Sequence, residues 1–329
     1  MKKIGVNGFG RIGRYFTRLL LEREDLDVAL VNDLADIDTL AHLFKYDSVH
    51  GRLKHSFVKE GSALIFDNGK RIEFVSEREP QNIPWEKFGI EIVLESTGIF
   101  RSKEAASAHL HAGVRHVLLS APSKDSFVPT VVLGANDDKI DWAEPIISNA
   151  SCTTNSAAPM VKVLLDLCKI ESAFITTVHS YTSDQRLHDA PHSDLRRARA
   201  AAVSIVPTTT GAAKALARIF PELEGHIGGC GVRVPVPDGS MTDLTLVVKN
   251  PPSEQAINAA MKRAAENELK GILEYTEDPI VSIDVVGNSH SCLFDAQLTS
   301  VIGNMVKVVG WYDNEAGYSN RLVDVITKL

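Results

Sequence analysis

Two hydrophobic periods alternate along the first half of the chain. Short apolar runs typical of buried strands occupy residues 3–7, 28–32 and 90–95. Residues 11–23 lie between the first two runs, and their apolar positions repeat at helical spacing. Strands that alternate with helices in this way predict a parallel sheet with crossover helices.

Further elements fit the same half. Asp67-Asn68-Gly69 stands between apolar runs at 63–66 and 72–75, which predicts a hairpin. A helix is expected at 103–112. Strands are expected at 116–120, 130–134 and 145–149.

The second half has longer strand patterns and fewer helices. Strands are expected at 173–180, 244–249, 292–300 and 305–311. Helices are expected at 156–169, 211–219 and 254–268, and the amphipathic residues 320–329 predict a closing helix. This pattern indicates an α+β domain with a mostly antiparallel sheet covered by helices.

Composition narrows the class of protein. A chain of 329 residues exceeds one typical core, so we expect two domains. The net charge of −7 argues against general nucleic-acid binding, and no apolar run is long enough for a membrane span or a signal peptide. The four cysteines are widely spaced, so we expect no disulfide framework, no metal site and a cytoplasmic location.

A glycine-rich turn follows the first strand and opens the first helix: Gly8-Phe9-Gly10-Arg11-Ile12-Gly13. Such glycines let a pyrophosphate approach the backbone at a helix N-terminus. Asp33 ends the second strand, where a carboxylate binds ribose hydroxyls and repels a 2′-phosphate. The pattern predicts a dinucleotide site that favours NAD over NADP.

Cys152 is the best candidate nucleophile. It lies where a strand gives way to a helix, and a helix N-terminus is expected to lower the pKa of a thiol. A lone cysteine is more often a packing residue, so Cys152 needs a base. His179 ends a predicted strand, but spacing alone does not select it among eleven histidines.

A resemblance to a known family selects His179 as the base for Cys152. Residues 150–159, Ala-Ser-Cys-Thr-Thr-Asn-Ser-Ala-Ala-Pro, closely resemble the active-site signature of glyceraldehyde-3-phosphate dehydrogenases. The resemblance extends through 7–13, 45–51, 95–98, 120–122, 179–182, 207–214, 233–235 and 311–315. Three positions depart from the family pattern: Ser156 replaces a common second cysteine, Ala316 stands where a tryptophan is common, and Ala190 weakens one cue for strict NAD use.

The resemblance implies a thioester mechanism in glycolysis. Cys152 attacks the aldehyde, His179 acts as base, NAD accepts hydride, and inorganic phosphate releases an acyl phosphate. Thr182 and Arg233 would hold the substrate phosphate, oriented by Asp184. The resemblance assigns the inorganic phosphate to Ser151, Thr153, Arg197, Thr210 and Gly211. It assigns NAD to Gly8, Gly10, Arg11, Ile12, Gly13, Asp33, Arg78, Ser120, Asn314 and Tyr318.

The implied architecture is an α/β protein in two domains. Residues 1–150 would form a Rossmann-type NAD-binding domain with a parallel sheet, and 151–313 an α+β catalytic domain with a mostly antiparallel sheet. Residues 314–329 would form a helix returning to the NAD-binding domain. The family implies a homotetramer. Two alternatives stay open: an erythrose-4-phosphate dehydrogenase and a non-catalytic surface binding protein.

Overall fold

The computed structural model describes residues 1–329, which form two compact units. The N-terminal unit contains Met1–Val131, Asp138–Ala150 and Ser319–Leu329, and the C-terminal unit contains Val132–Asp137 and Ser151–Tyr318. The chain passes from one unit to the other directly before the candidate nucleophile. None of the helices is both long and apolar enough to cross a membrane.

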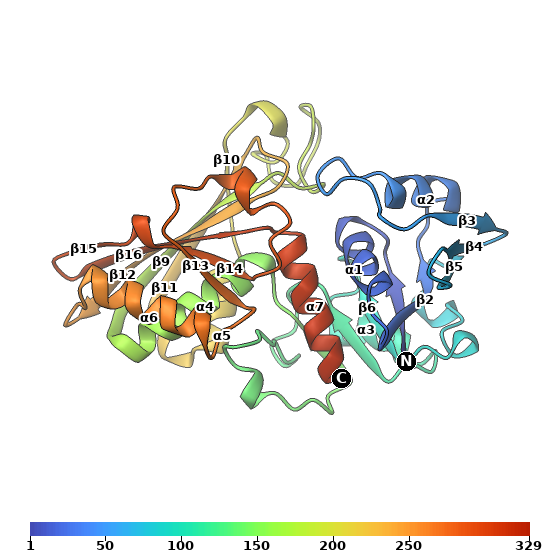
Figure 1. The fold of residues 1–329 in the computed structure, drawn as a ribbon, viewed down its shortest axis with the longest axis horizontal. Coiled ribbons are helices and arrows are strands. Elements are labelled where there is room, and N and C mark those ends of the chain that lie inside the picture. Colours follow the sequence, from blue (N-terminus) through green and yellow to red (C-terminus); the bar gives the residue numbers. More distant parts are fainter. The chain divides into compact units, whose positions relative to one another are not determined.

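The N-terminal unit contains a sheet of order β3-β4-β5-β2-β1-β6-β7-β8 (Figure 1). Its strands are β1 (Lys2–Asn7), β2 (Leu26–Asn32), β3 (Phe57–Glu60), β4 (Ala63–Phe66), β5 (Arg71–Val75), β6 (Ile92–Glu95), β7 (His116–Leu119) and β8 (Ile146–Ser148). The pairs from β5 to β8 are parallel, and β3–β4–β5 is antiparallel. The chain order reverses between β1 and β6, which is where ligands bind in open sheets of this kind.

Near-continuous apolar sequence explains why the parallel strands are central. Val93 and Val117 are fully buried beside Leu30 and the indole of Trp85. The helices of this unit are α1 (Arg11–Leu21), α2 (Ile37–Lys45), α3 (Lys103–Leu110) and most of α7 (Ala316–Lys328). A sheet covered on both faces buries its strands throughout, as the sequence pattern predicted.

The C-terminal unit contains a second sheet, of order β10-β11-β9-β12-β16-β14-β13, with β15 beside β16. Its strands are β9 (Lys169–Ser180), β10 (Val206–Thr208), β11 (Ile227–Val234), β12 (Ser240–Lys249), β13 (Leu273–Thr276), β14 (Cys292–Asp295), β15 (Ser300–Ile302) and β16 (Met305–Tyr312). Only β9–β11 and β13–β14 pair in parallel. The predicted fold, with one parallel sheet and one mostly antiparallel sheet, is confirmed.

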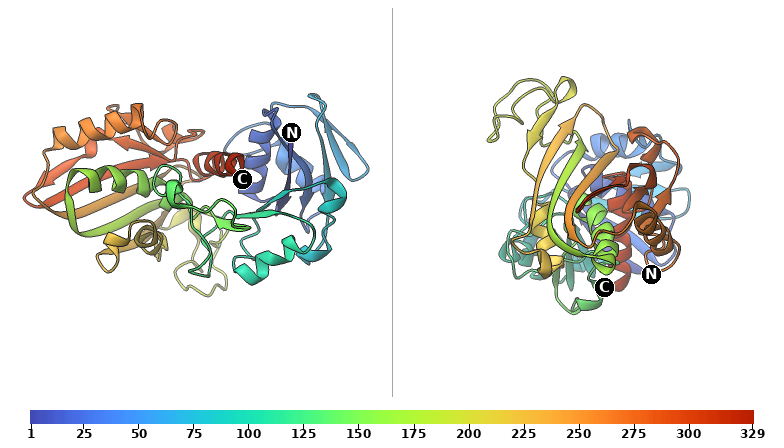
Figure 2. Two further views of the ribbon diagram at one scale, coloured as in Figure 1. Left: turned by 90° about the horizontal axis from the view of Figure 1, so that it is seen from below. Right: turned by 90° about the vertical axis from the view of Figure 1, so that its left-hand side faces the viewer.

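Three helices cover one face of the second sheet: α4 (Cys152–Leu167), α5 (Ala212–Ile219) and α6 (Glu254–Glu266) (Figures 1 and 2). Burial on β9 alternates from Ala173 to His179, so every second side chain faces these helices.

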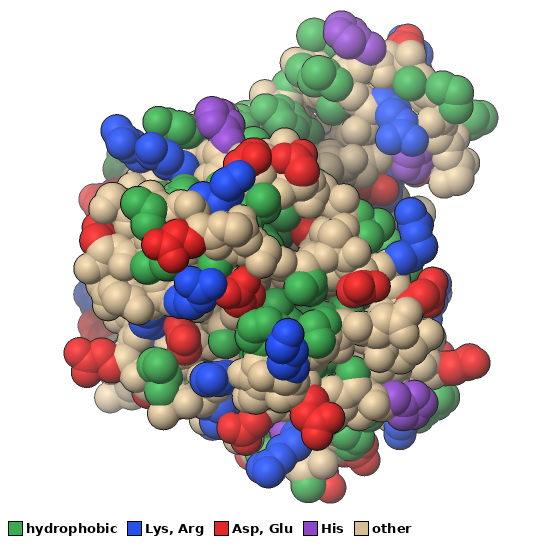
Figure 3. Space-filling model, turned by 90° about the vertical axis from the view of Figure 1, so that its right-hand side faces the viewer, with side chains coloured by type: hydrophobic (Ala, Val, Ile, Leu, Met, Phe, Trp, Pro, Cys, Tyr) green, Lys and Arg blue, Asp and Glu red, His purple; other side chains and the backbone are tan.

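The face of the molecule in Figure 3 carries acidic and basic side chains interspersed, with hydrophobic ones between them.

Some predicted elements differ from the structure. Residues 130–134 form only a single bridge from Thr130 to Ser148, because Pro129 precedes them and Gly134 turns the chain at φ +77°. The helix expected at 156–169 begins at Cys152, and Pro159 lies inside it. The sequence analysis missed α2, although Leu40, Ala41 and Phe44 repeat at helical spacing, and β11, whose glycine-rich sequence has no strong hydrophobic period.

Candidate active site

Cys152 is the first residue of α4. Ser151 caps the helix, and its hydroxyl accepts a hydrogen bond from the Thr154 N–H at 3.2 Å. Ala150 turns the chain into the cap with a left-handed φ of 54°, which is uncommon for a residue with a Cβ. This short turn leaves the Cys152 thiol beside the orphan N–H groups of the first helical turn.

His179 reaches the thiol from β9. The alternation of this strand places His179 on the same face as Thr177, the face that α4 covers. Its Nε2 lies 3.4 Å from the Cys152 Sγ. The other ring nitrogen, Nδ1, lies 2.8 Å from the carbonyl oxygen of Ser180. A carbonyl can only accept, so the tautomer that donates to Ser180 has its proton on Nδ1 and offers the Nε2 lone pair to the thiol, while the Arg233 guanidinium, which can only donate, lies against the same Nδ1.

Arg233 adds a positive charge to this pair. It projects from β11, where its register partner on β9 is His179. Its Nη1 donates to the Ser180 carbonyl at 2.9 Å and contacts the imidazole. A fixed cation at this point stabilises negative charge on Cys152 and opposes positive charge on His179.

The electrostatics keep one proton on the pair. Burial raises the pKa of the Cys152 thiol to about 11, although Arg233 lowers it. Burial and then Arg233 lower the pKa of His179 to about 3. The low thiol pKa expected from the helix N-terminus is therefore wrong, because lost hydration outweighs the dipole. Between these values the pair neither gains nor loses a proton, so the proton can only move between Sγ and Nε2.

Tyr312 supports the Cys152–His179 pair through hydrogen bonds and ring packing. The sequence analysis assigned it no role. Its hydroxyl lies 2.9 Å from the hydroxyls of both Thr153 and Thr177, which joins the first turn of α4 to β9. Its ring meets the His179 ring edge to face, with centroids 6.0 Å apart. Only its place at the end of a buried strand could have drawn attention to it.

A second arginine lies near the first. Arg197 Nε donates to the Thr208 hydroxyl at 2.8 Å, and its Nη1 pairs with Asp184. Arg197 and Asp184 both act on the pKa of Arg233, in opposite directions. The structure therefore brings the arginines expected at two separate phosphate sites into one electrostatic cluster.

The other expected anion ligands are dispersed around this cluster. Thr210 accepts from the Ala212 N–H at 3.2 Å, and Gly211 is the exposed N-cap of α5. Thr182 is half-buried just beyond β9. Thr153 is buried with its hydroxyl turned to Tyr312, whereas Ser151 is half-buried.

The glycine loop has the tight geometry that a pyrophosphate site needs. Gly8 has φ +95°, and a Cβ there would lie 2.8 Å from the backbone nitrogen of Thr97. A Cβ on Gly13 would lie 2.2 Å from the Gly8 carbonyl oxygen. Gly10 faces open space, and no side chain caps α1. An open cradle at an uncapped helix N-terminus suits a diphosphate.

Asp33 stands beside this cradle. Its carboxylate accepts from the Phe9 N–H at 2.7 Å and from the Ala35 N–H at 2.9 Å. Arg11 pairs with Asp47 at 2.6 Å, and Ile12 is half-buried beside it. The side chains of Asp33 and Arg11 therefore both make contacts within the protein that hold the glycine loop.

Two expected cofactor residues lie elsewhere in the N-terminal unit. Ser120 donates to the Glu95 carbonyl at 3.0 Å, at the end of β7. Arg78 is exposed on the loop after β5.

A buried polar chain supports the loop and was missed from sequence. Trp85 Nε1 donates to His109 Nδ1 at 3.1 Å, which leaves Nε2–H to donate to Glu95, also at 3.1 Å. The Glu95 carboxylate then accepts from Asn7 at 2.6 Å and from the Thr97 N–H at 2.8 Å. The two switch-point strands are therefore tied together at their carboxyl ends.

Asn314 and Tyr318 lie in the C-terminal unit, in and just before α7. Asn314 is buried, and its Oδ1 accepts from the hydroxyls of Ser180 and Ser240 at 2.8 and 2.7 Å. Tyr318 is also buried, which raises the pKa of its phenol.

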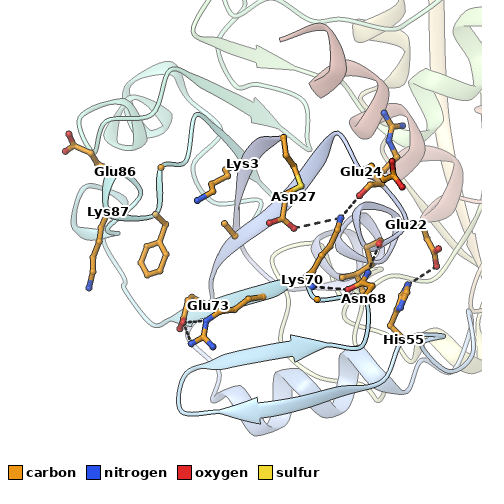
Figure 4. A pocket seen from close by; sticks show the side chains of 18 residues that line it. Lys3, Glu22, Glu24, Asp27, His55, Asn68, Lys70, Glu73, Glu86 and Lys87 are labelled. Atoms are coloured by element: carbon orange, nitrogen blue, oxygen red, sulfur yellow. Dashed lines mark hydrogen bonds and ion pairs between the residues drawn. The ribbon is translucent and has the colours of Figure 1, made fainter.

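A cavity of about 1160 Å³ lies at the opposite edge of the first sheet (Figure 4). It opens at the amino ends of the strands, and several of its charged side chains pair with one another or with the backbone. The Lys70 ammonium, for example, donates to the carbonyls of Leu20 in α1, Arg23 in the following turn and Leu26 at the start of β2. Dinucleotides bind at the carboxyl ends in such sheets, so this cavity is not the candidate cofactor site.

A glycine cradle on one sheet and a thiol–imidazole pair on the other are what a nicotinamide-dependent dehydrogenase with a cysteine nucleophile requires. Residues 2–103 match the family model of the glyceraldehyde 3-phosphate dehydrogenase NAD binding domain, and 151–314 match that of the C-terminal domain. The chain belongs to the glyceraldehyde-3-phosphate dehydrogenase family. The predicted family and the NAD cofactor are confirmed.

Relatives match along almost the whole chain. A glyceraldehyde-3-phosphate dehydrogenase of Mycobacterium avium is 53% identical over 330 aligned residues, which cover 98% of this chain and 97% of that protein. The enzyme of Geobacillus stearothermophilus is 54% identical, with 98% and 96% covered. Glyceraldehyde-3-phosphate dehydrogenase 2 of Streptomyces avermitilis is 54% identical, with 98% and 97% covered.

Proposed function

We propose that the protein oxidises D-glyceraldehyde 3-phosphate with NAD and inorganic phosphate to 1,3-bisphosphoglycerate, as a glycolytic enzyme. The observation that carries this proposal is the 3.4 Å contact between Cys152 Sγ and His179 Nε2 beside the Arg233 guanidinium. A thiol, a base and a fixed cation are what covalent capture of a phosphorylated aldehyde requires.

The chemistry uses the single proton of the pair. Cys152 Sγ attacks the aldehyde carbon while the thiol proton moves to His179 Nε2, giving a hemithioacetal. The imidazolium and the Cys152 N–H stabilise its oxyanion. NAD, when bound, accepts the hydride that leaves this carbon. Phosphate then attacks the resulting thioester, the C–S bond breaks, and the Cys152 sulfur recovers its proton from the imidazolium.

The anion-binding residues divide between two phosphates in this proposal. Thr182 and Arg233 bind the substrate phosphate, with Asp184 nearby. Ser151, Thr153, Arg197, Thr210 and Gly211 bind inorganic phosphate. Arg197 is close enough to lower the pKa of Arg233, which supports this assignment, because two neighbouring guanidinium groups gain most when anions lie between them.

For the cofactor, we propose residues 1–150 as the NAD-binding domain, 151–313 as the catalytic domain, and 314–329 as the helix that returns. Residues 8–13 would hold the pyrophosphate and Asp33 the adenosine ribose, while Arg78 and Ser120 lie nearby. Asn314 would bind the nicotinamide carboxamide, with Tyr318 behind the ring. The open space at Gly10 supports this assignment.

We propose a cytoplasmic homotetramer. Four free cysteines suit a reducing compartment. A cluster of exposed apolar side chains between 187 and 205 supports contact with further copies of the chain.

The central test replaces the nucleophile. Cys152→Ser should lower turnover by at least about a thousandfold while leaving NAD binding unchanged, because a serine hydroxyl ionises far less readily. Cys168→Ser, at the other end of α4, is the matched control and should retain turnover. Initial rates of NADH formation with and without phosphate complete the assay. A Cys152→Ser enzyme of normal activity, or turnover independent of phosphate, would refute the proposal.

A further inference from the structure

The amide of Asn314 is held by two buried hydroxyls. Ser180 Oγ and Ser240 Oγ both donate to its Oδ1, at 2.8 and 2.7 Å. Ser180, at the end of β9, and Ser240, at the start of β12, are both at most 1% exposed. Two donors therefore converge on one acceptor where no solvent competes.

A third hydrogen bond supports this direction at Ser240. The Ser180 N–H donates to Ser240 Oγ at 3.1 Å, which leaves the Ser240 hydroxyl proton for Asn314. If the Asn314 amide turned over, its NH₂ would face an oxygen that already accepts one hydrogen bond. The two hydroxyl protons would then lose their shared acceptor, and a buried unpaired hydroxyl is costly.

We propose that Ser180 and Ser240 are positioning residues that lock the Asn314 amide, so that its Nδ2 is the group presented to the nicotinamide carboxamide. The inference rests on the proposed role of Asn314. An asparagine amide is nearly symmetric in shape, so only its hydrogen bonds decide whether it offers a donor or an acceptor. With Oδ1 occupied, Asn314 offers a donor, which suits the carbonyl of the carboxamide.

Ser180 also touches the proton-transfer side of the reaction. Its backbone carbonyl accepts from His179 Nδ1 at 2.8 Å and from Arg233 Nη1 at 2.9 Å. One residue thus fixes the base through its backbone and the amide through its side chain. Substituting the side chain removes the second role and leaves the carbonyl in place, so the two can be separated by experiment.

The test compares two ligands. NAD carries the carboxamide, whereas ADP-ribose lacks the nicotinamide altogether. Dissociation constants for both would be measured by titration calorimetry for Ser180→Ala, Ser240→Ala and the double variant. Ser156→Ala is the matched control, since its buried hydroxyl bonds to Thr242 on the same strand as Ser240, at 3.1 Å.

We expect the double variant to bind NAD about fivefold to thirtyfold more weakly, because about 1 kcal/mol is lost per hydroxyl. ADP-ribose affinity should change by less than about twofold, as should both affinities of the control. Deuterated aldehyde substrate should show that a fraction of hydride reaches the other face of the ring. If the double variant does not fold, the single variants carry the same comparison with smaller shifts.

Two results separate this inference from the proposed function. If Asn314→Ala weakens NAD selectively but the serine variants do not, the positioning role is overturned and the role of Asn314 stands. If Asn314→Ala leaves the ratio of NAD to ADP-ribose affinity unchanged, Asn314 does not contact the nicotinamide, and its proposed role fails. Equal weakening of both ligands in the serine variants would reduce the hydroxyls to a structural role and overturn the inference.

Discussion

The Cys152 thiol lies beside one candidate proton acceptor, the His179 imidazole. The position of that ring determines where the thiol proton can move. His179 Nε2 lies 3.4 Å from the Cys152 sulfur, while Nδ1 lies against the Ser180 carbonyl and the Arg233 guanidinium. Burial raises the pKa of the thiol to about 11. A free thiolate is therefore unfavourable at neutral pH, and the imidazole is the group placed to take the thiol proton as the sulfur attacks a carbonyl carbon.

This arrangement predicts a change in pH dependence when the base is removed. In His179→Asn, a thiol with a raised pKa must lose its proton to solvent, so its reactivity should appear only as pH rises. Alkylation of Cys152 by iodoacetamide at pH 7 should fall at least about tenfold and then rise about tenfold per pH unit. His226→Asn, an exposed histidine of the same unit, is the control. An identical pH profile in wild type and His179→Asn would contradict this account.

At the scale of elements, helix ends are satisfied by side chains from distant segments. Lys70, on the hairpin that leads into β5, donates to the carbonyls of Leu20 at the end of α1, Arg23 in the following turn and Leu26 at the start of β2 (Figure 4). A cation there also interacts favourably with the helix dipole. The hairpin and helix α1, far apart in sequence, are thereby fixed to each other.

Replacing this lysine should loosen α1. Lys70→Met keeps the aliphatic stem but removes the ammonium from these carbonyls, and should lower the free energy of unfolding by about 1–2 kcal/mol. Arg71→Met, the exposed neighbour paired with Glu73, should cost less than about 0.5 kcal/mol. Urea unfolding of both variants provides the comparison. Equal losses would show that the carbonyl contacts contribute nothing beyond a surface ion pair.

Elements with strong periods were predictable, and contacts between them were not. The alternation on β9 and the glycine turn after β1 were visible in the sequence, as was the hairpin at Asn68. The strand predicted at residues 130–134 was wrong, because a short apolar run does not reveal whether a partner strand is available. The Cys152–His179 pairing required family resemblance. Tyr312 and Ser240 escaped notice, since their roles depend on strands that meet only in the folded chain.

At the scale of the whole molecule, the segment between β9 and β10 exposes unusual apolar surface. Leu195 and Val203 are 81% and 80% exposed, and Leu187 and Ile205 are each 69% exposed. Such a concentration in one segment favours burial against another protein surface. The proposed homotetramer would supply that surface from further copies of the same chain.

Charges in this segment should therefore weaken assembly. Leu195→Glu with Val203→Glu should shift the protein from a tetramer, four times 35.9 kDa, toward smaller species. Sedimentation velocity measures the distribution. Val58→Glu, which charges an exposed apolar side chain on edge strand β3, is the control and should stay tetrameric. A monomeric wild-type protein, or a double variant that remains tetrameric, would rule out this segment as the contact.

The Ser156 hydroxyl affects how Cys152 responds to oxidation. It lies one helical turn beyond Cys152 and bonds to Thr242, so no thiol stands at the next position of that helix face. A sulfenic acid formed on Cys152 by peroxide therefore meets no cysteine one turn along α4, and the thiol that bonds to Ser156 is that of Cys292, on β14. Where no protein thiol resolves it, a sulfenic acid is reduced by small thiols such as glutathione or proceeds to the irreversible sulfinic and sulfonic acids. Glutathione should therefore protect the activity of this protein against peroxide.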